Sequence, residues 1–265
     1  MHPIFLKIGN FELASYGLMT ALGYAVASGY LVPRLKNSGI KGLNKDTFWN
    51  LLFIVFVGAI IGGKLLFIIV SWPQLGATFA EKISTIIHDI RYGFVFFGGL
   101  LVAVTGALWY MRRKKLPILK TSDFFIVALP LGHALGRIGC LLAGCCYGKP
   151  TTLPWGVRFT DPHALVPPEL LNIPLHPTQL YESMLNFLLF LLLHYASQKP
   201  HREGKILVLY VLCYATMRFG IEFLRGDYRG GFLLGMSPSQ VISLCVAGVA
   251  LWIWATYLRE GKHAR

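Results

Sequence analysis

The sequence has few charged residues for its length. Of 265 residues, only 14% are charged, whereas a soluble domain usually carries about 25%. Hydrophobic residues make up 55% of the chain, and its mean hydropathy is +0.57. Disordered, collagen-like and disulfide-scaffold proteins are thereby excluded. Apolar runs recur along the whole length, which also excludes a soluble enzyme with one tail anchor. The chain is predicted to be an all-α polytopic membrane protein.

Carboxylates and cysteines are both scarce. There are 12 Asp and Glu against 25 Lys and Arg, a net charge of +13. In a soluble fold such an excess would favour nucleic-acid binding. Here the basic residues lie between apolar runs, where cytoplasmic loops and anionic head groups account for them. The lipid bilayer is therefore expected as a partner and nucleic acid is not. Five cysteines are too few for a disulfide scaffold.

Seven apolar runs approach the length of about 20 residues that a membrane-crossing helix needs. They are 13–32, 48–70, 92–111, 124–143, 183–198, 206–224 and about 20 residues from Ser239. The segments after the first, third, fifth and seventh runs hold more than twice as many Lys and Arg as those on the other side. The positive-inside rule therefore predicts about seven transmembrane helices, with the N-terminus outside and the C-terminus cytoplasmic.

The longest connection between runs, at about 144–179, is rich in proline. Proline disfavours regular helix there. The connection also contains apolar residues, namely Leu153, Trp155, Val157, Phe159, Leu165 and Val166. We expect a small packed extracytoplasmic cap. The simplest interpretation is a single transmembrane domain, 1–265, that carries this cap.

Ionisable residues within or beside the runs are the candidates for function. Each costs about 2.5–3.5 kcal/mol at the centre of a membrane helix, so each needs a partner or a role. They are Lys64, Arg137, Glu182, Arg218, Glu222 and Arg225. One interpretation is an ion network that holds the helices together. The other is that cations left over after pairing bind a phospholipid phosphate, which Arg can do with two hydrogen bonds.

Cys140, Cys145 and Cys146 allow three interpretations. With His176 they match no familiar metal-ligand spacing, and they contain no Cys-x-x-Cys redox motif, although a vicinal pair could still react. Small, buried packing residues are the favoured interpretation. No metal and no cofactor are expected.

Four motifs occur in a fixed order along the chain: Tyr16 to Met19 (YGLM), Gly136 to Gly139 (GRIG), His176 to Glu182 (HPTQLYE) and Arg218 to Arg225 (RFGIEFLR). This set resembles the prolipoprotein diacylglyceryl transferases of bacterial inner membranes, over nearly the whole chain. The resemblance implies seven spans with the N-terminus outside. It also implies transfer of the diacylglyceryl group of phosphatidylglycerol to the lipobox cysteine of prolipoprotein signal sequences. The products would be a thioether and glycerol phosphate.

The resemblance also implies roles for individual residues. Arg137 and Arg218 match the family's essential arginines and would bind the phosphate. The resemblance does not supply the base, and our own hypothesis is that His133 or His176 takes the thiol proton. His133 lies four residues before Arg137 and so shares its helix face. The positions expected to bind substrate are Tyr16, Lys64, Gly98, Gly99, Cys140, Cys145, Gly148, Gln179, Tyr181, Glu182, Glu222 and Arg225.

The chain departs from the family pattern at four positions. Phe97 stands where the family usually has histidine, Lys64 where it has arginine, and Cys140 and Cys145 where it has Asn and Glu. The half of the site that would bind the leaving group is thus retained, while the half that would activate the thiol is changed.

Two alternatives follow from these departures. One is a family paralogue that transfers a phospholipid-derived group to a different acceptor, with Cys145 or Cys146 as nucleophile. The other is a non-enzymatic lipid-binding or redox membrane protein that uses Cys140, Cys145 and Cys146.

Overall fold

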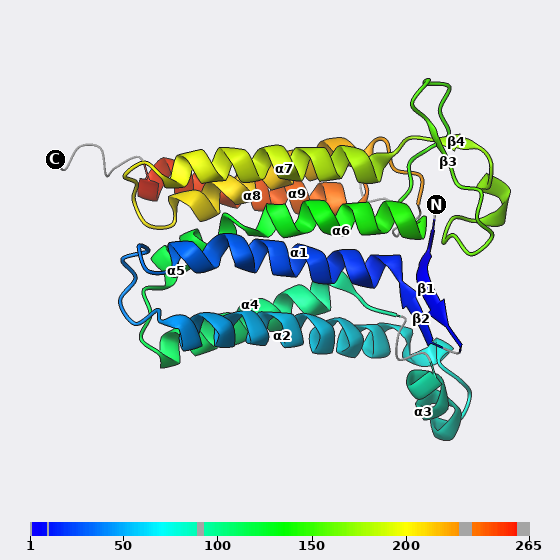
Figure 1. Cartoon of the computed structure of the whole chain (residues 1–265), viewed down its shortest axis with the longest axis horizontal. Coiled ribbons are helices and arrows are strands. Elements are labelled where there is room, and N and C mark those ends of the chain that lie inside the picture. The colour runs from blue at the N-terminus through cyan, green and yellow to red at the C-terminus, as the bar shows by residue number, and fades with distance from the viewer. Residues whose placement is uncertain (1, 10, 89–92, 228–234, 259–265) are drawn as a thin grey trace. The chain divides into compact units, whose positions relative to one another are not determined.

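The computed structural model describes residues 2–9, 11–88, 93–227 and 235–258, and these are mostly helical (Figure 1). The chain divides into two compact units, Met1–Arg34 with Ser122–Arg265, and Leu35–Thr121. The expectation of a single domain stays a prediction, and each unit is described by itself.

The first unit contains most of the helices. Its elements are β1 (Ile4–Ile8), β2 (Phe11–Ala14), α1 (Ser15–Leu31), α6 (Leu129–Ala143), β3 (Val157–Arg158), β4 (Pro174–Leu175), α7 (Thr178–Ser197), α8 (Lys205–Glu222) and α9 (Pro238–Ile253). The two strand pairs, β1 with β2 and β3 with β4, are both antiparallel. Helix α5 (Ile118–Ile126) crosses the boundary between the units.

Helices α1 and α6 run antiparallel and approach closely through glycine. A Cβ atom on Gly23 would lie 2.6 Å from the carbonyl oxygen of Gly132, and Gly139 packs against Tyr16 and Met19. Small residues let membrane helices approach in this way. The end of α6 therefore lies beside the start of α1, on the side of the unit where β3 and β4 lie (Figure 1).

Helix α7 supplies much of the core of the first unit. Leu189, Phe190 and Leu193 are buried against Val127 and Ile206. The start of α8 is anchored by Asp123, whose carboxylate accepts hydrogen bonds from the backbone N–H groups of Gly204 (2.7 Å) and Leu207 (2.8 Å). This satisfies N–H groups that a helix start otherwise leaves without partners.

The connection between α6 and α7 has an apolar core of its own. Its members are Tyr147, Phe159, Ala164, Val166 and Leu175. The expected packing is confirmed for Phe159 and Val166 and is wrong for three of the other apolar residues: Leu153, Trp155 and Leu165 are exposed. A short loop segment with two small strands has too little area to enclose them all.

The second unit is built on α2 (Lys45–Ser71) and α4 (Phe96–Arg113), with α3 (Phe79–His88) between them in sequence. The two long helices meet through glycine. A Cβ on Gly62 would lie 2.3 Å from the carbonyl oxygen of Gly98, and one on Gly58 would lie 3.1 Å from Ala103 Cα. Asn50 also donates a hydrogen bond of 3.0 Å to the hydroxyl of Tyr110.

All seven predicted apolar runs coincide with helices, but not all of these helices are long and apolar enough to count as membrane spans. Within the described residues, Lys45–Gln74 and Pro238–Tyr257 are long and apolar enough to cross a membrane, and α5 with α6, bent by 41°, could form a third span. Helix α8 carries Lys205, Arg218 and Glu222, and α1 has only 17 residues. These helices support a membrane protein, whereas the number seven and the orientation remain proposals.

Candidate functional site

Glu182, in the first turns of α7, joins two arginines from different parts of the chain. Its Oε2 lies 2.7 Å from Nη2 of Arg137 on α6, and its Oε1 lies 2.9 Å from Nη1 of Arg225, which follows α8. Glu182 is 4% exposed and Arg225 is 5% exposed. The short distances and the burial make these charge-assisted bonds stronger than those of a surface pair.

Arg225 has a second carboxylate partner that sequence reasoning missed. Its Nε and Nη2 donate to Oδ1 and Oδ2 of Asp227 at 2.8 and 2.7 Å, a bidentate pair. Asp227 lies just beyond the apolar run and was therefore not counted, although its position two residues after Arg225 was a usable signal. In the first unit Arg137, Arg218 and Arg225 thus face Glu182, Glu222 and Asp227. Counted with Lys64 of the second unit, four cations stand against three carboxylates, so Asp227 reduces the expected surplus of positive charge without removing it.

Arg218 forms the second part of the site. Its Nη2 lies 2.5 Å from Oε2 of Glu222 one turn later on α8, and also donates a hydrogen bond of 3.2 Å to Ser239 Oγ on α9. Arg218 and Glu182 line one small cavity. The full lining is Glu182, Leu185, Asn186, Tyr214, Met217, Arg218 and Ile221. Asn186, which sequence reasoning also missed, donates from Nδ2 to the Glu182 carbonyl at 2.7 Å.

The two histidine candidates have different surroundings. His133 Nε2 accepts a hydrogen bond of 3.1 Å from Arg137 Nε, and the His133 ring lies 5.6 Å from the Tyr214 ring. His176 is tied through its backbone, which bonds with Lys149 and Gly148. Its Nδ1 is buried and has no hydrogen-bond partner among the described residues. Only His133 is held through its side chain to an arginine of the site.

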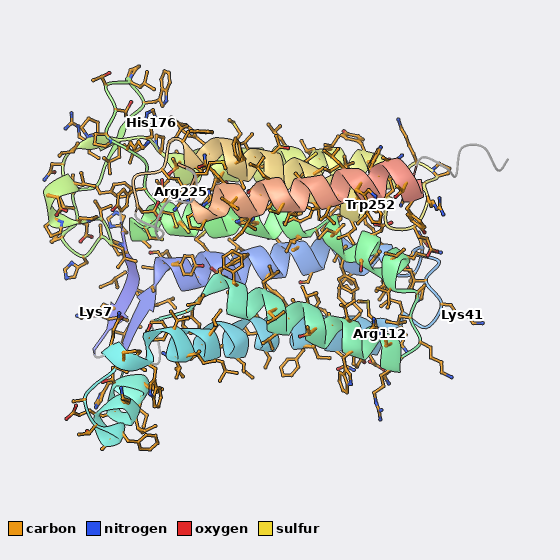
Figure 2. The ribbon with its side chains drawn as sticks, turned by 180° about the vertical axis from the view of Figure 1, so that it is seen from behind. Lys7, Lys41, Arg112, His176, Arg225 and Trp252 are labelled. Carbon is orange, nitrogen blue, oxygen red and sulfur yellow. The ribbon has the colours of Figure 1, made fainter. Side chains whose placement is uncertain are left out.

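The connection that precedes α7 is fixed by hydrogen bonds to the loop after α6. Gln179 Nε2 donates to the Cys145 carbonyl at 2.7 Å, and Thr178 Oγ1 donates to the Cys146 carbonyl at 2.8 Å. Gly148 is required nearby because a Cβ there would lie 2.5 Å from His176 Cβ. His176 and Arg225 consequently lie at one end of the unit and Trp252 at the other (Figure 2).

The two tyrosines predicted to bind substrate, Tyr16 and Tyr181, are in different surroundings. Tyr16, at the start of α1, is 48% exposed. The Tyr181 hydroxyl accepts a hydrogen bond of 2.7 Å from Trp155 Nε1. The hydroxyl of Tyr181 is thus already hydrogen-bonded to a residue of the cap.

Three of the predicted substrate-binding residues belong to the second unit. Gly98 and Gly99 are buried where α4 meets α2, and a Cβ on Gly99 would lie 2.7 Å from the Ala59 carbonyl oxygen. Lys64 Nζ lies 5.2 Å from the centre of the Phe67 ring and 5.6 Å from that of Phe94. Close helix packing explains the two glycines, and their contact with substrate stays a prediction.

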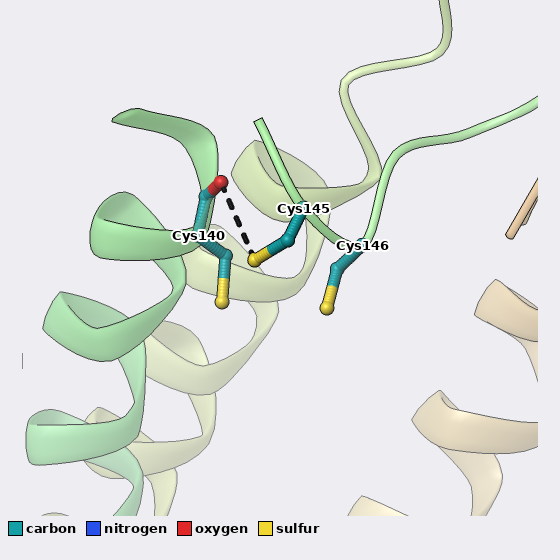
Figure 3. Close-up of side chains that lie close together, drawn as sticks. All are labelled: Cys140, Cys145 and Cys146. Carbon is teal, nitrogen blue, oxygen red and sulfur yellow. Dashed lines mark hydrogen bonds between the residues drawn. The ribbon is translucent and has the colours of Figure 1, made fainter. Parts of the chain in front are cut away.

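The three clustered cysteines meet at the end of α6. The Sγ atoms of Cys140, Cys145 and Cys146 all lie within 4.8 Å of one another (Figure 3). The Cys145 thiol also points at the Cys140 carbonyl oxygen, 3.8 Å away. Cys140 is buried, as expected, and the other two are partly buried.

Comparison with known proteins places these motifs in one family. The model of the prolipoprotein diacylglyceryl transferase family matches residues 3–256. A phosphatidylglycerol–prolipoprotein diacylglyceryl transferase of Clostridium tetani is 37% identical over 96% of this chain and 97% of its own length. The phosphatidylglycerol–prolipoprotein diacylglyceryl transferase 2 of Clostridium perfringens is 35% identical over 95% of this chain and 94% of its own length. The phosphatidylglycerol–prolipoprotein diacylglyceryl transferase of Pseudoalteromonas atlantica is 34% identical over 99% of this chain and 91% of its own length. The resemblance inferred from the motifs is confirmed: the chain belongs to the prolipoprotein diacylglyceryl transferase family.

Proposed function

We propose that the protein transfers the diacylglyceryl group of phosphatidylglycerol to the thiol of a prolipoprotein cysteine. The observation that carries this proposal is the arrangement of Arg137, Glu182 and Arg218. Arg137 is paired with Glu182, and Glu182 lines the same cavity as Arg218. Two helix-borne guanidinium groups are thereby held close to one cavity, in a chain that matches the family over residues 3–256.

The reaction is a displacement at a saturated glycerol carbon. The acceptor sulfur forms a bond to that carbon, the bond from carbon to phosphate oxygen breaks, and glycerol phosphate leaves with the bonding electrons. The thiol proton must pass to a base. Because negative charge becomes concentrated on the leaving phosphate, fixed cations stabilise the transition state more than the ground state. Arg137 and Arg218 would do this.

The carboxylates would position these arginines. A guanidinium carries five N–H donors in a fixed plane, so a carboxylate on one edge leaves donors on the other edges for a phosphate. Beside Arg137, a Cβ on Gly136 would meet nothing within 4 Å among the described residues. This open space lies on α6 at the position next to Arg137, whose side chain is itself 12% exposed, and a lipid head group would approach from there.

His176 is the better of the two candidate bases. Nε2 of His133 already accepts the hydrogen bond from Arg137, so its lone pair is engaged by a cation. His176 has a buried Nδ1 without a partner among the described residues. A base has to offer a lone pair to the thiol proton, and Nδ1 of His176 would supply one in the tautomer protonated at Nε2.

The site and the fold suggest an orientation in the bacterial inner membrane. In the first unit the cap lies at the end where α6 and α8 finish, whereas Lys199, Arg202 and Lys205 lie around the connection from α7 to α8 at the other end. With the positive-inside rule, we propose seven spans with the cap and N-terminus outside and the C-terminus in the cytoplasm.

Covalent catalysis by Cys145 or Cys146 is less well supported. A thiolate of the enzyme would form a thioether with the diacylglyceryl carbon. The acceptor would then have to expel a thiolate from a saturated carbon, a poorer leaving group than a phosphate. Direct transfer avoids this second step.

The decisive experiment measures transfer by the purified chain in detergent. Labelled phosphatidylglycerol is mixed with a peptide that contains a lipobox cysteine, and label on the peptide thiol is followed. We expect transfer by the native chain and a loss of at least about 100-fold in Arg137→Ala and Arg218→Ala, because removal of one donor to a developing oxyanion costs about that much. Arg112→Ala, at an exposed position of α4, is the matched control and should retain its rate.

Two results would contradict the proposal. One is absence of labelled peptide from native protein that unfolds cooperatively. The other is equal transfer by the native, Arg137→Ala and Arg218→Ala proteins. For the base, His176→Ala should slow transfer more than His133→Ala, and the reverse order would assign the proton to His133.

A further inference from the structure

Cys140, Cys145 and Cys146 gather soft ligand atoms at the junction of α6 and the cap. Cys140 lies in the last turn of α6, and the other two lie in the loop that follows. All three Sγ atoms are within 4.8 Å of one another, and Figure 3 shows the three side chains side by side. No disulfide joins any of the described cysteines. The three sulfur atoms are thereby placed where one ion could contact them all.

The local fold holds these thiols together. Gly144 ends α6 in the left-handed conformation, with φ of 77°, and so turns the chain back. The carbonyl groups of Cys145 and Cys146 accept hydrogen bonds from Gln179 and Thr178 at the start of α7. Because the loop backbone is fixed on both sides, the thiols meet without further rearrangement of the chain.

The spacing suits coordination of one ion. Metal–sulfur bonds of about 2.3 Å place sulfur atoms of a trithiolate site about 4 Å apart. The separations here need shorten by no more than about 1 Å, within the reach of small χ1 rotations. Three thiolates would leave a fourth tetrahedral position for water or another ligand, as in zinc sites that keep an open position.

Two arginines influence the thiol cluster. Arg225 and Arg137 both act electrostatically on Cys146. Three thiolates with a divalent ion carry one net negative charge, which the same arginines would stabilise.

We propose that Cys140, Cys145 and Cys146 form a trithiolate binding site for a thiophilic d10 metal ion, of which Zn²⁺ is the common example. Binding releases the remaining thiol protons to water, without any change of oxidation state. The bound ion would clamp the end of α6 to the loop that leads to the cap. The spacing of the three cysteines in sequence matched no known metal motif, and their meeting depends on the turn at Gly144.

The test uses the purified, reduced full chain in detergent with Cd²⁺ as a spectroscopic probe. Thiolate coordination produces an ultraviolet sulfur-to-cadmium charge-transfer band. We expect this band to saturate at one Cd²⁺ per chain and to disappear when Zn²⁺ displaces the cadmium. Cys140→Ser, Cys145→Ser and Cys146→Ser should each weaken binding at least tenfold, because each removes one of three ligands. Thermal unfolding of each variant checks that it is folded.

Cys213→Ser is the matched control, since Cys213 lies on α8 outside the cluster and should not affect the band. The proposal is overturned by absence of the band in native protein or by an unchanged band in all three cluster variants. A count of three reactive thiols in denatured protein isolated without air would also overturn it, since a resident disulfide would then occupy two ligands. Cadmium binding does not depend on lipid transfer, so either proposal can fail while the other stands.

Discussion

Glu182 is the residue on which the arginine cluster depends. It is buried and pairs with both Arg137 and Arg225. Breaking a buried ion pair by removing one charge costs about 3–5 kcal/mol, because the partner charge stays buried. If Glu182 is neutralised, Arg225 still pairs with Asp227, so Arg137 loses more of its stabilising interaction than Arg225 does.

We expect Glu182→Gln to lower the free energy of unfolding by about 3 kcal/mol, at the lower end of that range because the amide oxygen still accepts one hydrogen bond. The measurement is thermal unfolding in detergent, followed by circular dichroism. Glu12→Gln makes the same chemical change in an exposed pair with Lys7 and should shift the midpoint little. Equal shifts in the two variants would mean that the Glu182 pairs do not stabilise the fold.

The close contact between α2 and α4 explains why α4 has glycine at positions 98 and 99. Gly98 was predicted to bind substrate, but its missing side chain is explained by packing, since a Cβ there would lie 2.3 Å from the Gly62 carbonyl oxygen. Backbone cannot move aside as a flexible side chain can, so overpacking at this position is costly.

Gly98→Ala should therefore lower the free energy of unfolding by about 3 kcal/mol. On α9, Gly248 meets nothing within 4 Å of an added Cβ among the described residues. Gly248→Ala should accordingly be neutral or stabilise by up to about 1 kcal/mol through helix propensity. Unfolding midpoints of the two variants test this, together with the KM for phosphatidylglycerol. A Gly98→Ala protein of native stability with a raised KM would assign Gly98 to substrate binding.

The proposed orientation of the whole molecule rests on its distribution of basic residues, and it can be tested directly. An epitope tag inserted after Pro154, at an exposed position of the cap, should bind antibody in intact spheroplasts. A tag inserted after Lys199, between α7 and α8, should bind only after the membrane is permeabilised. The physical reason is that Lys and Arg near helix ends are retained on the cytoplasmic side. Reversed accessibility of the two tags would exclude the proposed orientation.

Much of the architecture can be predicted from amino-acid composition and from patterns of residues that are close together in the sequence. All seven apolar runs coincide with helices because an apolar stretch in a bilayer must satisfy its backbone hydrogen bonds internally. The family can likewise be recognised from contiguous motifs such as His176 to Glu182. The match of the family model over residues 3–256 confirms it. Arg137 and Glu182 were identified because a buried charge in an apolar run needs a partner.

Other features depend on residues that are distant in sequence. Asp227 completes the charge balance of the arginine cluster only because the chain after α8 brings Arg225 to Glu182. The assignment of Gly98 and Gly99 to helix packing likewise depends on where α2 meets α4.

By itself, then, the sequence determined the membrane class, the helices and the family, since each depends on local hydropathy or on an uninterrupted motif. Only the tertiary structure decided which carboxylate pairs with which arginine, which histidine side chain bonds to Arg137, and that three thiols meet at one point. Ion pairs and metal sites require atoms within a few ångströms, and that proximity is created when turns such as the one at Gly144 bring separate segments together.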